Sequence, residues 1–465
     1  MSKSSYDVVI LGGGPGGYTA AIRAAQLGKR TAIIERERLG GVCLNWGCVP
    51  TKALLRNAEI FRLFQASEQW GISADNLRFD FPKIIKRSRG IADRVSKGVE
   101  YLMKKNSIDF FAGSGRLLSA EAVEVRAEGK PTQTIKGAHV IIATGARPRS
   151  VPGVTIDRKR IITSTEAMTL PELPASMVII GAGAIGVEFA YFYNALGTRV
   201  TVVEMMPSIL PIEDRELTKL LESSLKKQGI QIFTQTRVES ARVTDAGVSV
   251  NIHTPSGAQE LSANFALSAV GVQGNTENIG LESLGVKVER NHIVVDTYYR
   301  TSVAGVYAVG DVIGPPWLAH VASAEGVCCA EAIAGKDPQP VDYSTIPGCT
   351  YCHPQLASVG FTEEMAKTEG YEVKIGRFPF RPLGKAMAIG EAEGMVKLIF
   401  DAKYGELLGA HILGAEATEL IAELVLAKKL EATGSDIFRT IHAHPTLSEA
   451  VMEAAAAAYG EAINI

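Results

Sequence analysis

Residues 6–35 decide the fold of this chain. They read YDVVILGGGPGGYTAAIRAAQLGKRTAIIE. A short apolar run leads into a glycine cluster at 12–17, an alanine-rich helical stretch follows to Gln26, and a second apolar run ends at Glu35. This order predicts a strand, a tight turn, a helix and a second strand, with the turn bringing backbone N–H groups close to a pyrophosphate at the start of the helix.

The same unit occurs a second time in residues 177–204, which read MVIIGAGAIGVEFAYFYNALGTRVTVVE. Each landmark of the second copy lies 169 residues after its counterpart, and in both copies an acidic residue stands 23 positions after the first glycine. A turn that only packs a helix against a strand is the alternative, but the complete context in both copies favours bound ligands. The predicted cofactor-binding residues are Gly12, Gly14, Gly17 and Glu35 in the first copy and Gly181, Gly183, Gly186 and Glu204 in the second.

Two dinucleotide sites in one chain indicate FAD and a nicotinamide dinucleotide that are joined by hydride transfer. The carboxylate of Glu204 would repel a 2′-phosphate, and Met205 and Met206 follow it where an NADP site would favour arginine. We therefore expect NAD rather than NADP.

Composition and charge exclude several classes of protein. The 465 residues suggest about three domains, and 48 Lys and Arg against 50 Asp and Glu leave no basic excess for nucleic acid. No apolar run reaches the roughly 18 residues that a membrane span needs, and the N-terminus lacks the apolar core of a signal peptide. Six cysteines are too few for a disulfide scaffold. We expect a soluble, cytoplasmic α/β protein in which a disulfide would need a catalytic explanation.

The pattern of expected strands and helices divides the chain into domains. We expect domains at 1–150 and 151–272, each built on one copy of the repeat, a central part at 273–345 and a separate α+β domain at 346–465. A mostly helical stretch at 49–105 and short strands at 109–116, 122–126 and 139–143 lie between the copies. Strands at 355–361, 395–400 and 407–413 and helices at 415–429 and 446–459 are expected in the last domain.

Residues 40–52, GGVCLNWGCVPTK, carry the most informative cysteines. Cys43 and Cys48 cannot bridge within a regular helix, but Gly47 permits an irregular loop and Pro50 suits a first helical turn. Cys48 would then lie near a helix N-terminus, where the helix dipole lowers the pKa of a thiol, and Lys52 would stabilise the thiolate further. The segment predicts a redox-active disulfide; two buried core cysteines are the alternative.

The sequence resembles the pyridine nucleotide–disulfide oxidoreductases over essentially its whole length. The matching segments, in order, are the first glycine-rich turn, the segment from Cys43 to Cys48, Ala143-Thr144-Gly145, the second turn, Thr301 with Ala308-Val309-Gly310-Asp311, and residues 442–449. The resemblance implies two Rossmann-like domains, for FAD and NAD, with 273–345 completing the FAD site and 346–465 forming a dimerisation domain.

The resemblance also implies roles for single residues. Cys43 would exchange with the substrate disulfide, and Cys48 would lie against the flavin. His444 would be the general base, oriented by Glu449, although Thr446 and Glu449 are also spaced as a capping box. Lys52 and Glu188 would form an ion pair beside the flavin and the nicotinamide. Thr144, Gly145, Gly310 and Asp311 would contact FAD.

The activity implied is the oxidation of dihydrolipoyl groups by NAD⁺ through FAD and the cysteine pair. The partner would be a lipoyl-bearing acyltransferase subunit or a lipoyl carrier protein, and the protein would be a homodimer in which His444 and Glu449 complete the active site of the second copy. Another disulfide reductase of the same family and a non-catalytic flavoprotein scaffold are the alternatives.

Two further cysteine clusters are expected to carry no chemistry. Residues 349–353, CTYCH, match the haem-attachment pattern C-x-x-C-H, but nothing else supports export or haem. Neighbouring ligands for zinc are missing from the sequence pattern, so we expect no metal. Cys328 and Cys329 fall in an alanine-rich helical run and are expected to pack in a core.

Overall fold

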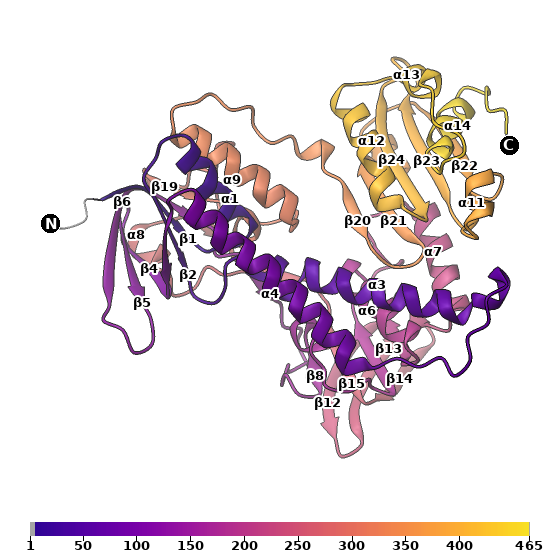
Figure 1. Ribbon diagram of the computed structural model, residues 1–465, viewed down its shortest axis with the longest axis horizontal. Coiled ribbons are helices and arrows are strands. Elements are labelled where there is room, and N and C mark those ends of the chain that lie inside the picture. Colours follow the sequence, from indigo (N-terminus) through magenta and orange to yellow (C-terminus); the bar gives the residue numbers. More distant parts are fainter. Residues whose placement is uncertain (1–4, 465) are drawn as a thin grey trace. The chain divides into compact units, whose positions relative to one another are not determined.

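A computed structural model describes residues 5–464 and divides into two compact units, which are described separately (Figure 1). The first unit comprises residues up to 54 together with 82–149 and 271–341. Its centre is a parallel sheet in the order β3-β2-β1-β6, with β19 on the other side of β6. These strands are β1 Tyr6–Leu11, β2 Thr31–Glu35, β3 Asp109–Ala112, β6 Gln133–Ile142 and β19 Val306–Ala308.

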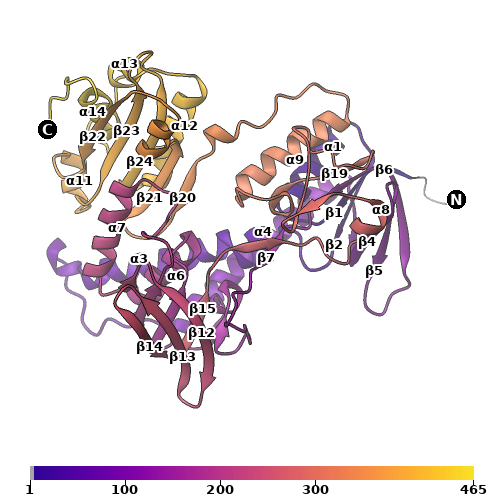
Figure 2. The same ribbon diagram turned by 180° about the vertical axis from the view of Figure 1, so that it is seen from behind.

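The glycine-rich turn of this unit stands at the carboxyl end of β1, in the middle of the sheet. Val8 pairs with Thr31 of β2 and with His139 of β6, so β1 is hydrogen-bonded on both sides. Helix α1 (Pro15–Gln26) follows the turn and packs against α9 (Ala319–Ile333), beside it in both views (Figures 1 and 2). A Cβ on Gly326 of α9 would lie 2.4 Å from the carbonyl oxygen of Gly16, so the two helices touch through their backbones.

The remaining elements of the first unit flank this sheet. An antiparallel extension adds β5 (Ala122–Arg126) and β4 (Ser114–Ser119) to β6. Antiparallel β7 (Ala146–Pro148) and β16 (Val272–Gly274) connect the polypeptide into and out of the unit. The short elements are α2 Gly41–Trp46, α8 Leu281–Leu284, β17 Val288–Glu289, β18 His292–Ile293 and η2 Gly310–Ile313, and the long helices are α3 Cys48–Gln65 and α4 Phe81–Lys105.

The second unit comprises residues 55–81, 150–270 and 342–464 and repeats the arrangement of the first. Its parallel sheet has the order β11-β10-β9-β15-β8. Helix α6 (Ala184–Ala195) follows β9 across the second glycine-rich turn, as α1 follows β1. The strands of this sheet are β8 Ile161–Ile162, β9 Ser176–Ile180, β10 Arg199–Val203, β11 Gln231–Phe233 and β15 Phe265–Ser268. The further helices are α5 Ser164–Ala167 and α7 Arg215–Lys227. A separate three-stranded sheet consists of β12 Arg237–Thr244, β13 Gly247–Thr254 and β14 Gly257–Ala263.

The C-terminal part of the second unit is an antiparallel sheet in the order β20-β21-β24-β23-β22. Its inner face forms a core with α12 and α14 that includes Phe378, Phe380 and Phe400, all fully buried. The strands are β20 Gly348–Thr350, β21 Gln355–Gly360, β22 Val373–Pro379, β23 Met395–Asp401 and β24 Leu407–Gly414, and the helices are η1 Ser67–Trp70, η3 Tyr343–Thr345, α10 Glu363–Thr368, α11 Gly384–Ala388, α12 Ala417–Lys429, α13 Gly434–Arg439 and α14 Glu449–Ala457.

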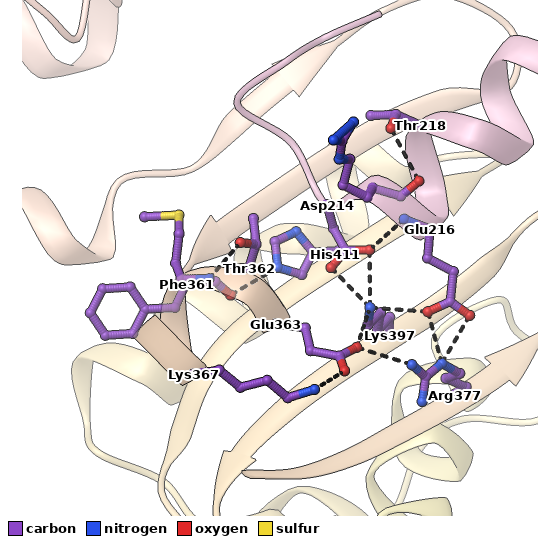
Figure 3. A network of polar contacts seen from close by, with 12 residues as sticks. Asp214, Glu216, Thr218, Phe361, Thr362, Glu363, Lys367, Arg377, Lys397 and His411 are labelled. Atoms are coloured by element: carbon purple, nitrogen blue, oxygen red, sulfur yellow. Dashed lines mark hydrogen bonds and ion pairs between the residues drawn. The ribbon is translucent and has the colours of Figure 1, made fainter. Parts of the chain in front are cut away.

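A buried cluster of charges joins this sheet to helix α7 (Figure 3). The ammonium group of Lys397 on β23, only 2% exposed, lies 2.9 Å from Asp214 Oδ2, 3.0 Å from Glu216 Oε2 and 2.9 Å from Glu363 Oε2. Asp214 is the N-cap of α7 and accepts a hydrogen bond from the Glu216 N–H. Burial alone would lower the pKa of Lys397, but its hydrogen bonds to the three carboxylates raise it. The ammonium therefore fixes the start of α7.

The predicted α/β fold class is confirmed, and three segments differ in detail. The strand expected at 109–116 is two strands, because Gly113 turns the chain at a φ of +157° between β3 and β4. The strand expected at 139–143 begins earlier, at Gln133, and the helix expected at 446–459 is shorter, because α14 begins at Glu449 and ends at Ala457.

Candidate active site

The cysteine segment adopts two helices separated by a single glycine. Cys43 lies in α2, Gly47 ends that helix with φ −147° and ψ −118°, and Cys48 is the first residue of α3. The predicted position of Cys48 at a helix N-terminus is thus confirmed, whereas Cys43 lies on a helix rather than in the irregular loop. The break is held by Thr51, whose hydroxyl donates to the Gly47 carbonyl at 2.7 Å.

The thiols of Cys43 and Cys48 hydrogen-bond to each other. Cys43 is half-buried and Cys48 is exposed. The hydrogen bond with Cys48 raises the pKa of the Cys43 thiol, burial raises it further, and the positive charge of Lys52 opposes both. The structure thus brings together the three predicted residues, because Cys48 and Lys52 both act on the Cys43 thiol.

Arg89 supports this segment from helix α4, a contact that sequence reasoning missed. Its guanidinium stacks on the ring of Trp46 at 4.1 Å and donates to the Asn45 carbonyl. The side-chain amide of Asn45 in turn donates to the carbonyls of Leu39 and Gly41. Arg89 follows α2 by more than 40 residues in one of several charged positions of a long helix, so no local pattern could single it out.

The three predicted glycines of the first glycine-rich turn have two different roles. A Cβ on Gly12, at φ +111°, would lie 2.2 Å from the Ala143 carbonyl oxygen, and one on Gly17 would lie 1.9 Å from the Gly12 oxygen. A Cβ on Gly14 would meet only the Gly41 Cα, at 3.9 Å. Protein packing therefore requires glycine at the first and third positions, while the second leaves room for a ligand backbone such as a pyrophosphate.

The second turn repeats this division of roles at Gly181, Gly183 and Gly186. A Cβ would lie 2.5 Å from the Ala269 oxygen at Gly181 and 2.0 Å from the Gly181 oxygen at Gly186, but at Gly183 it would meet nothing within 4 Å. Gly183 is the N-cap of α6 and no side chain caps that helix, so the first N–H groups of α6 have no side-chain acceptor. The donors and the open space fit the diphosphate of a bound dinucleotide.

The predicted acids Glu35 and Glu204 accept hydrogen bonds from backbone N–H groups of the two turns. Oε2 of Glu35 accepts from Gly13 N at 2.7 Å and Oε1 from Glu37 N at 2.8 Å. Oε2 of Glu204 accepts from Ala182 N at 2.7 Å and its Oε1 from Met206 N at 2.8 Å. The carboxylates therefore hold their turns in place and retain lone pairs for ribose hydroxyls.

The other predicted FAD residues surround β6 and β19. The backbone N–H of Gly310 donates to the buried carboxylate of Glu325, at 2.6 Å. Asp311 follows in η2, where burial raises the pKa of its carboxyl to about 6. A carboxylate so poorly hydrated gains from hydroxyl donors, which fits a polyhydroxylated ligand such as the ribityl chain of FAD.

Thr144 and Gly145 follow β6, but the side chain of Thr144 is used by the protein itself. Its hydroxyl donates to the Asn275 carbonyl at 2.8 Å, and the Asn275 amide donates to the Thr144 carbonyl at 2.9 Å. The Asn275 N–H donates to the Gly145 carbonyl. Asn275 was missed from the sequence, since a single asparagine in a loop gives no signal of a partner 131 residues away.

The predicted pair His444 and Glu449 is formed within the second unit. His444 Nδ1 lies 2.8 Å from Glu449 Oε1, and Glu449 Oε2 accepts from the Thr446 N–H at 2.9 Å. The pKa of Glu449 is lowered because these hydrogen bonds outweigh its burial. The capping box is not formed, because Ser448 is the N-cap of α14 and no side chain caps this helix; Glu449 instead binds His444 through one oxygen and the Thr446 N–H through the other.

Glu188 and Lys52 belong to different units and are described separately. Glu188 lies on α6 and is 4% exposed, so it is no ordinary surface charge. Its Oε1 accepts from the Tyr351 N–H at 3.0 Å. Lys52 lies one helical turn after Cys48 on α3.

The other four cysteines are buried or half-buried. Cys328 and Cys329 lie on α9 and are buried in the core of the first unit. Cys352 is buried, and its thiol donates to the Pro354 carbonyl, while Cys349 lies half-buried on β20. Within the described part of the chain, no three His, Cys, Asp or Glu side chains gather so as to hold a metal ion. Among residues 5–464, none of the helices combines the length and apolarity needed to cross a membrane.

Comparison with known proteins agrees with this architecture. Residues 6–326 match the pyridine nucleotide-disulphide oxidoreductase family, and residues 346–455 match the dimerisation domain of that family. The chain therefore belongs to the pyridine nucleotide-disulphide oxidoreductases and is an oxidoreductase.

Several curated relatives are named dihydrolipoyl dehydrogenase. The dihydrolipoyl dehydrogenase of Rhizobium etli is 49% identical, and that of Zymomonas mobilis is 48% identical, each alignment covering 99% of both chains. The crystal structure of LpdA from Mycobacterium tuberculosis has a TM-score of 0.90 at 28% identity, covering 97% of this chain and 98% of that one. Family and relatives imply FAD and NAD as the cofactors.

Proposed function

We propose that this protein oxidises dihydrolipoyl groups with NAD⁺, the activity that its named relatives indicate. The observation that carries the proposal is the hydrogen-bonded pair of thiols formed by Cys43 on α2 and Cys48 at the start of α3, in the unit that also holds the first glycine-rich turn. FAD and NAD⁺, when bound, supply the hydride-transfer chemistry that carries electrons away from the dithiol. The first turn with Asp311 and Gly310 suits FAD, and the second turn with Glu204 suits NAD⁺.

His444 is assigned the proton transfer. Because an ionised carboxylate only accepts hydrogen bonds, the contact with Glu449 places the ring proton on Nδ1 and leaves the Nε2 lone pair free. The side chain is 77% exposed, so Nε2 is accessible to a thiol of the substrate. In the family, the histidine at this position serves the second copy of a dimer, and we extend that arrangement to His444, Glu449 and the dimerisation domain.

The thiol chemistry balances as two successive exchanges. The reaction starts from the oxidised form, in which Cys43 and Cys48 are joined as a disulfide. His444 removes a proton from one substrate thiol, the thiolate attacks Sγ of Cys43, and the Cys43–Cys48 bond breaks with Cys48 leaving as the thiolate. The second substrate thiol then displaces Cys43, so the substrate departs as a cyclic disulfide. One proton ends on Cys43 and the other leaves through His444.

Supporting roles complete the proposal. Lys52, which already acts electrostatically on Cys43, would pair with Glu188 beside the reacting groups. Residues 1–150 and 273–345 would hold FAD, 151–272 would hold NAD⁺, and 346–465 would form the homodimer. The physiological substrate would be the lipoyl group of an acyltransferase subunit or of a lipoyl carrier protein. A cytoplasmic location, favoured by the sparse cysteines, belongs to the same proposal.

The test is NADH-dependent reduction of lipoamide by the flavin-loaded protein. Cys43→Ser and Cys48→Ser should each lower kcat by about 10³-fold or more, because each removes an atom of the reacting bond. His444→Ala should cost about 10²- to 10⁴-fold, the range for a general acid–base group. Cys349→Ser is the matched control and should keep the wild-type rate.

Two results would contradict the proposal. Absence of lipoamide turnover by the wild type, with reduction of another disulfide such as glutathione disulfide, would favour a different reductase of the family. Near-normal lipoamide rates in the Cys43→Ser variant would remove the assigned chemistry altogether. A non-catalytic scaffold would reduce neither substrate.

A further inference from the structure

The chain carries a second histidine two residues before His444, and the two imidazoles have different surroundings. The side chain of His442 is 5% exposed, against 77% for His444. Nε2 of His442 lies 2.8 Å from Oε1 of Glu423 on α12, and its Nδ1 lies 2.9 Å from the Thr440 carbonyl oxygen. Both ring nitrogens of His442 are thus engaged within the second unit, whereas His444 is held at Nδ1.

These contacts fix the proton count of His442. A carboxylate oxygen and a carbonyl oxygen only accept hydrogen bonds, so each ring nitrogen must carry a proton. A neutral imidazole has one N–H and would leave a buried nitrogen lone pair facing an oxygen. The imidazolium satisfies both contacts at once, and its charge is matched by Glu423 on α12 and by Glu449 on α14, both of which act on it electrostatically.

His442 lies in the segment that carries His444, residues 440–446 between α13 and α14. The C-terminal side of this segment is held by Glu449, which binds the Thr446 N–H. Its N-terminal side is tied to the neighbouring helix α12 through His442 and Glu423. His444 stands between these two attachments, so the direction of its ring depends on both.

We propose that His442 is a positioning residue that stays protonated in the active protein. Its imidazolium donates hydrogen bonds to Glu423 and to the Thr440 carbonyl and so fixes segment 440–446. The fixed segment keeps His444 in contact with Glu449 for proton transfer. The proposal rests on the proposed function for its catalytic consequence, but the charge state of His442 is independent of it.

The electrostatics agree with the geometry. The hydrogen bond that His442 donates to Glu423 raises the pKa of His442 above its ordinary value, although burial opposes this. A group with a raised pKa in the folded state keeps its stabilising contact at low and neutral pH and loses it as the pH rises through that pKa. His442 also lowers the pKa of Glu449, so its charge keeps the partner of His444 ionised.

The first measurement is a pH titration of the eight histidines by NMR, on flavin-loaded protein labelled with ¹³C-histidine. His442→Gln identifies the His442 signal by its loss. In wild-type protein that signal should keep the imidazolium form to higher pH than an ordinary histidine, and Glu423→Gln should lower its pKa because it removes the charged acceptor. Glu419→Gln, which removes a charge one turn earlier on α12, should leave it unchanged. A wild-type His442 signal with an ordinary pKa that ignores Glu423→Gln would overturn the proposal.

The second measurement separates positioning from general damage. Glu423→Gln should move the alkaline limb of the kcat/KM profile for dihydrolipoamide to lower pH by the amount seen in the titration, and His442→Gln should lower kcat about tenfold or more. NADH-dependent reduction of ferricyanide, which bypasses the thiols and His444, should stay at the wild-type rate. An equal loss at every pH, or in both assays, would make His442 merely structural.

The two proposals fail in different ways. If wild-type protein lacks dihydrolipoamide activity, the proposed function fails, and the titration still decides whether His442 is a buried imidazolium. If the wild type is active and the His442 signal does not depend on Glu423, only the positioning role fails.

Discussion

Gly14 and Gly183 occupy the middle positions of their turns, and nothing in the protein explains why they lack side chains. Their neighbours Gly17 and Gly186 are explained by packing, because a Cβ there would enter a backbone carbonyl. In the sequence these four glycines are equivalent members of the same motif. The structure separates the glycines that are needed for folding from those that leave space for a ligand.

This separation predicts opposite phenotypes for two neighbouring substitutions. Gly183 has φ −70° and ψ −179°, which alanine adopts without strain, so Gly183→Ala should leave the melting temperature unchanged or slightly raised. The new methyl group would occupy the space for the pyrophosphate, and the KM for NAD⁺ should rise about tenfold or more. Isothermal calorimetry with NAD⁺ and a thermal melt check both parts.

Gly186→Ala is the matched control for that prediction. Its methyl group would lie 2.0 Å from the Gly181 oxygen, so the helix must shift away from the turn. We expect a loss of about 1–3 kcal/mol in unfolding free energy, the usual cost of overpacking. Equal NAD⁺ affinity in the Gly183→Ala and wild-type proteins would argue against a dinucleotide at this turn.

At the scale of elements, Lys397 shows how a strand and a helix from distant parts of the chain are joined. Asp214 begins α7 and Lys397 lies on β23, 183 residues later, yet both are almost completely buried. Arg377 binds the outer carboxylates, Glu216 and Glu363, and encloses the cluster (Figure 3). The stability of the protein should therefore depend on the ion pair between Lys397 and Asp214.

Lys397→Met should destabilise the protein by about 3–5 kcal/mol, because it leaves the Asp214 carboxylate buried without its cation. The double variant Asp214→Asn and Lys397→Met should recover part of this loss, since asparagine still caps α7 and carries no charge. Urea unfolding gives both values. Lys367→Met, which removes only an exposed ion pair with Glu363, should cost less than about 1 kcal/mol; a similar loss in both lysine variants would contradict the argument.

Elements with a strong local pattern could be predicted, and elements set by packing could not. Strand β1 and helix α1 follow from an apolar run, a glycine turn and an alanine-rich stretch. Strand β22 was not predicted, because Gly376 interrupts its pattern. That glycine is required by the close approach of α14, whose Ala454 oxygen would lie 1.8 Å from a Cβ. The cause lies 78 residues away and leaves no trace in the strand itself.

For the whole molecule, the repeat at an interval of 169 residues is the feature that the sequence reveals most completely. It extends to hydrogen bonds, since Glu35 binds Gly13 and Glu204 binds Ala182 at the same distance of 2.7 Å. The candidate site is less complete from sequence, because its motif residues were found but their support from Arg89, Asn275 and Glu325 was not. Such contacts join single polar residues across long separations, where periodicity gives no information.

Acid sensitivity is a whole-molecule consequence of the carboxylates in the second unit. Hydrogen bonds to Lys367 and Lys397 outweigh burial and lower the pKa of Glu363 to about 2, and the pKa of Asp214 is lowered as well. A carboxyl with a lowered pKa in the folded state contributes stability above its unfolded pKa and loses it as the pH falls. The unfolding free energy should therefore drop between about pH 5 and pH 2. Urea midpoints across this range should fall less steeply in the Lys397→Met variant, and parallel curves would contradict the assignment.

The carboxylate of Glu204 disfavours a 2′-phosphate and also holds the turn through its hydrogen bonds. This double role limits how the coenzyme preference can be redesigned. An engineer who wants the chain to accept a 2′-phosphate would first replace this acid, yet the same side chain holds the backbone of Ala182 and Met206. A neutral substitute would admit the phosphate and at the same time release the turn beneath it. A successful exchange must therefore supply a second acceptor for those two amides, which makes it a redesign of the loop rather than of one position.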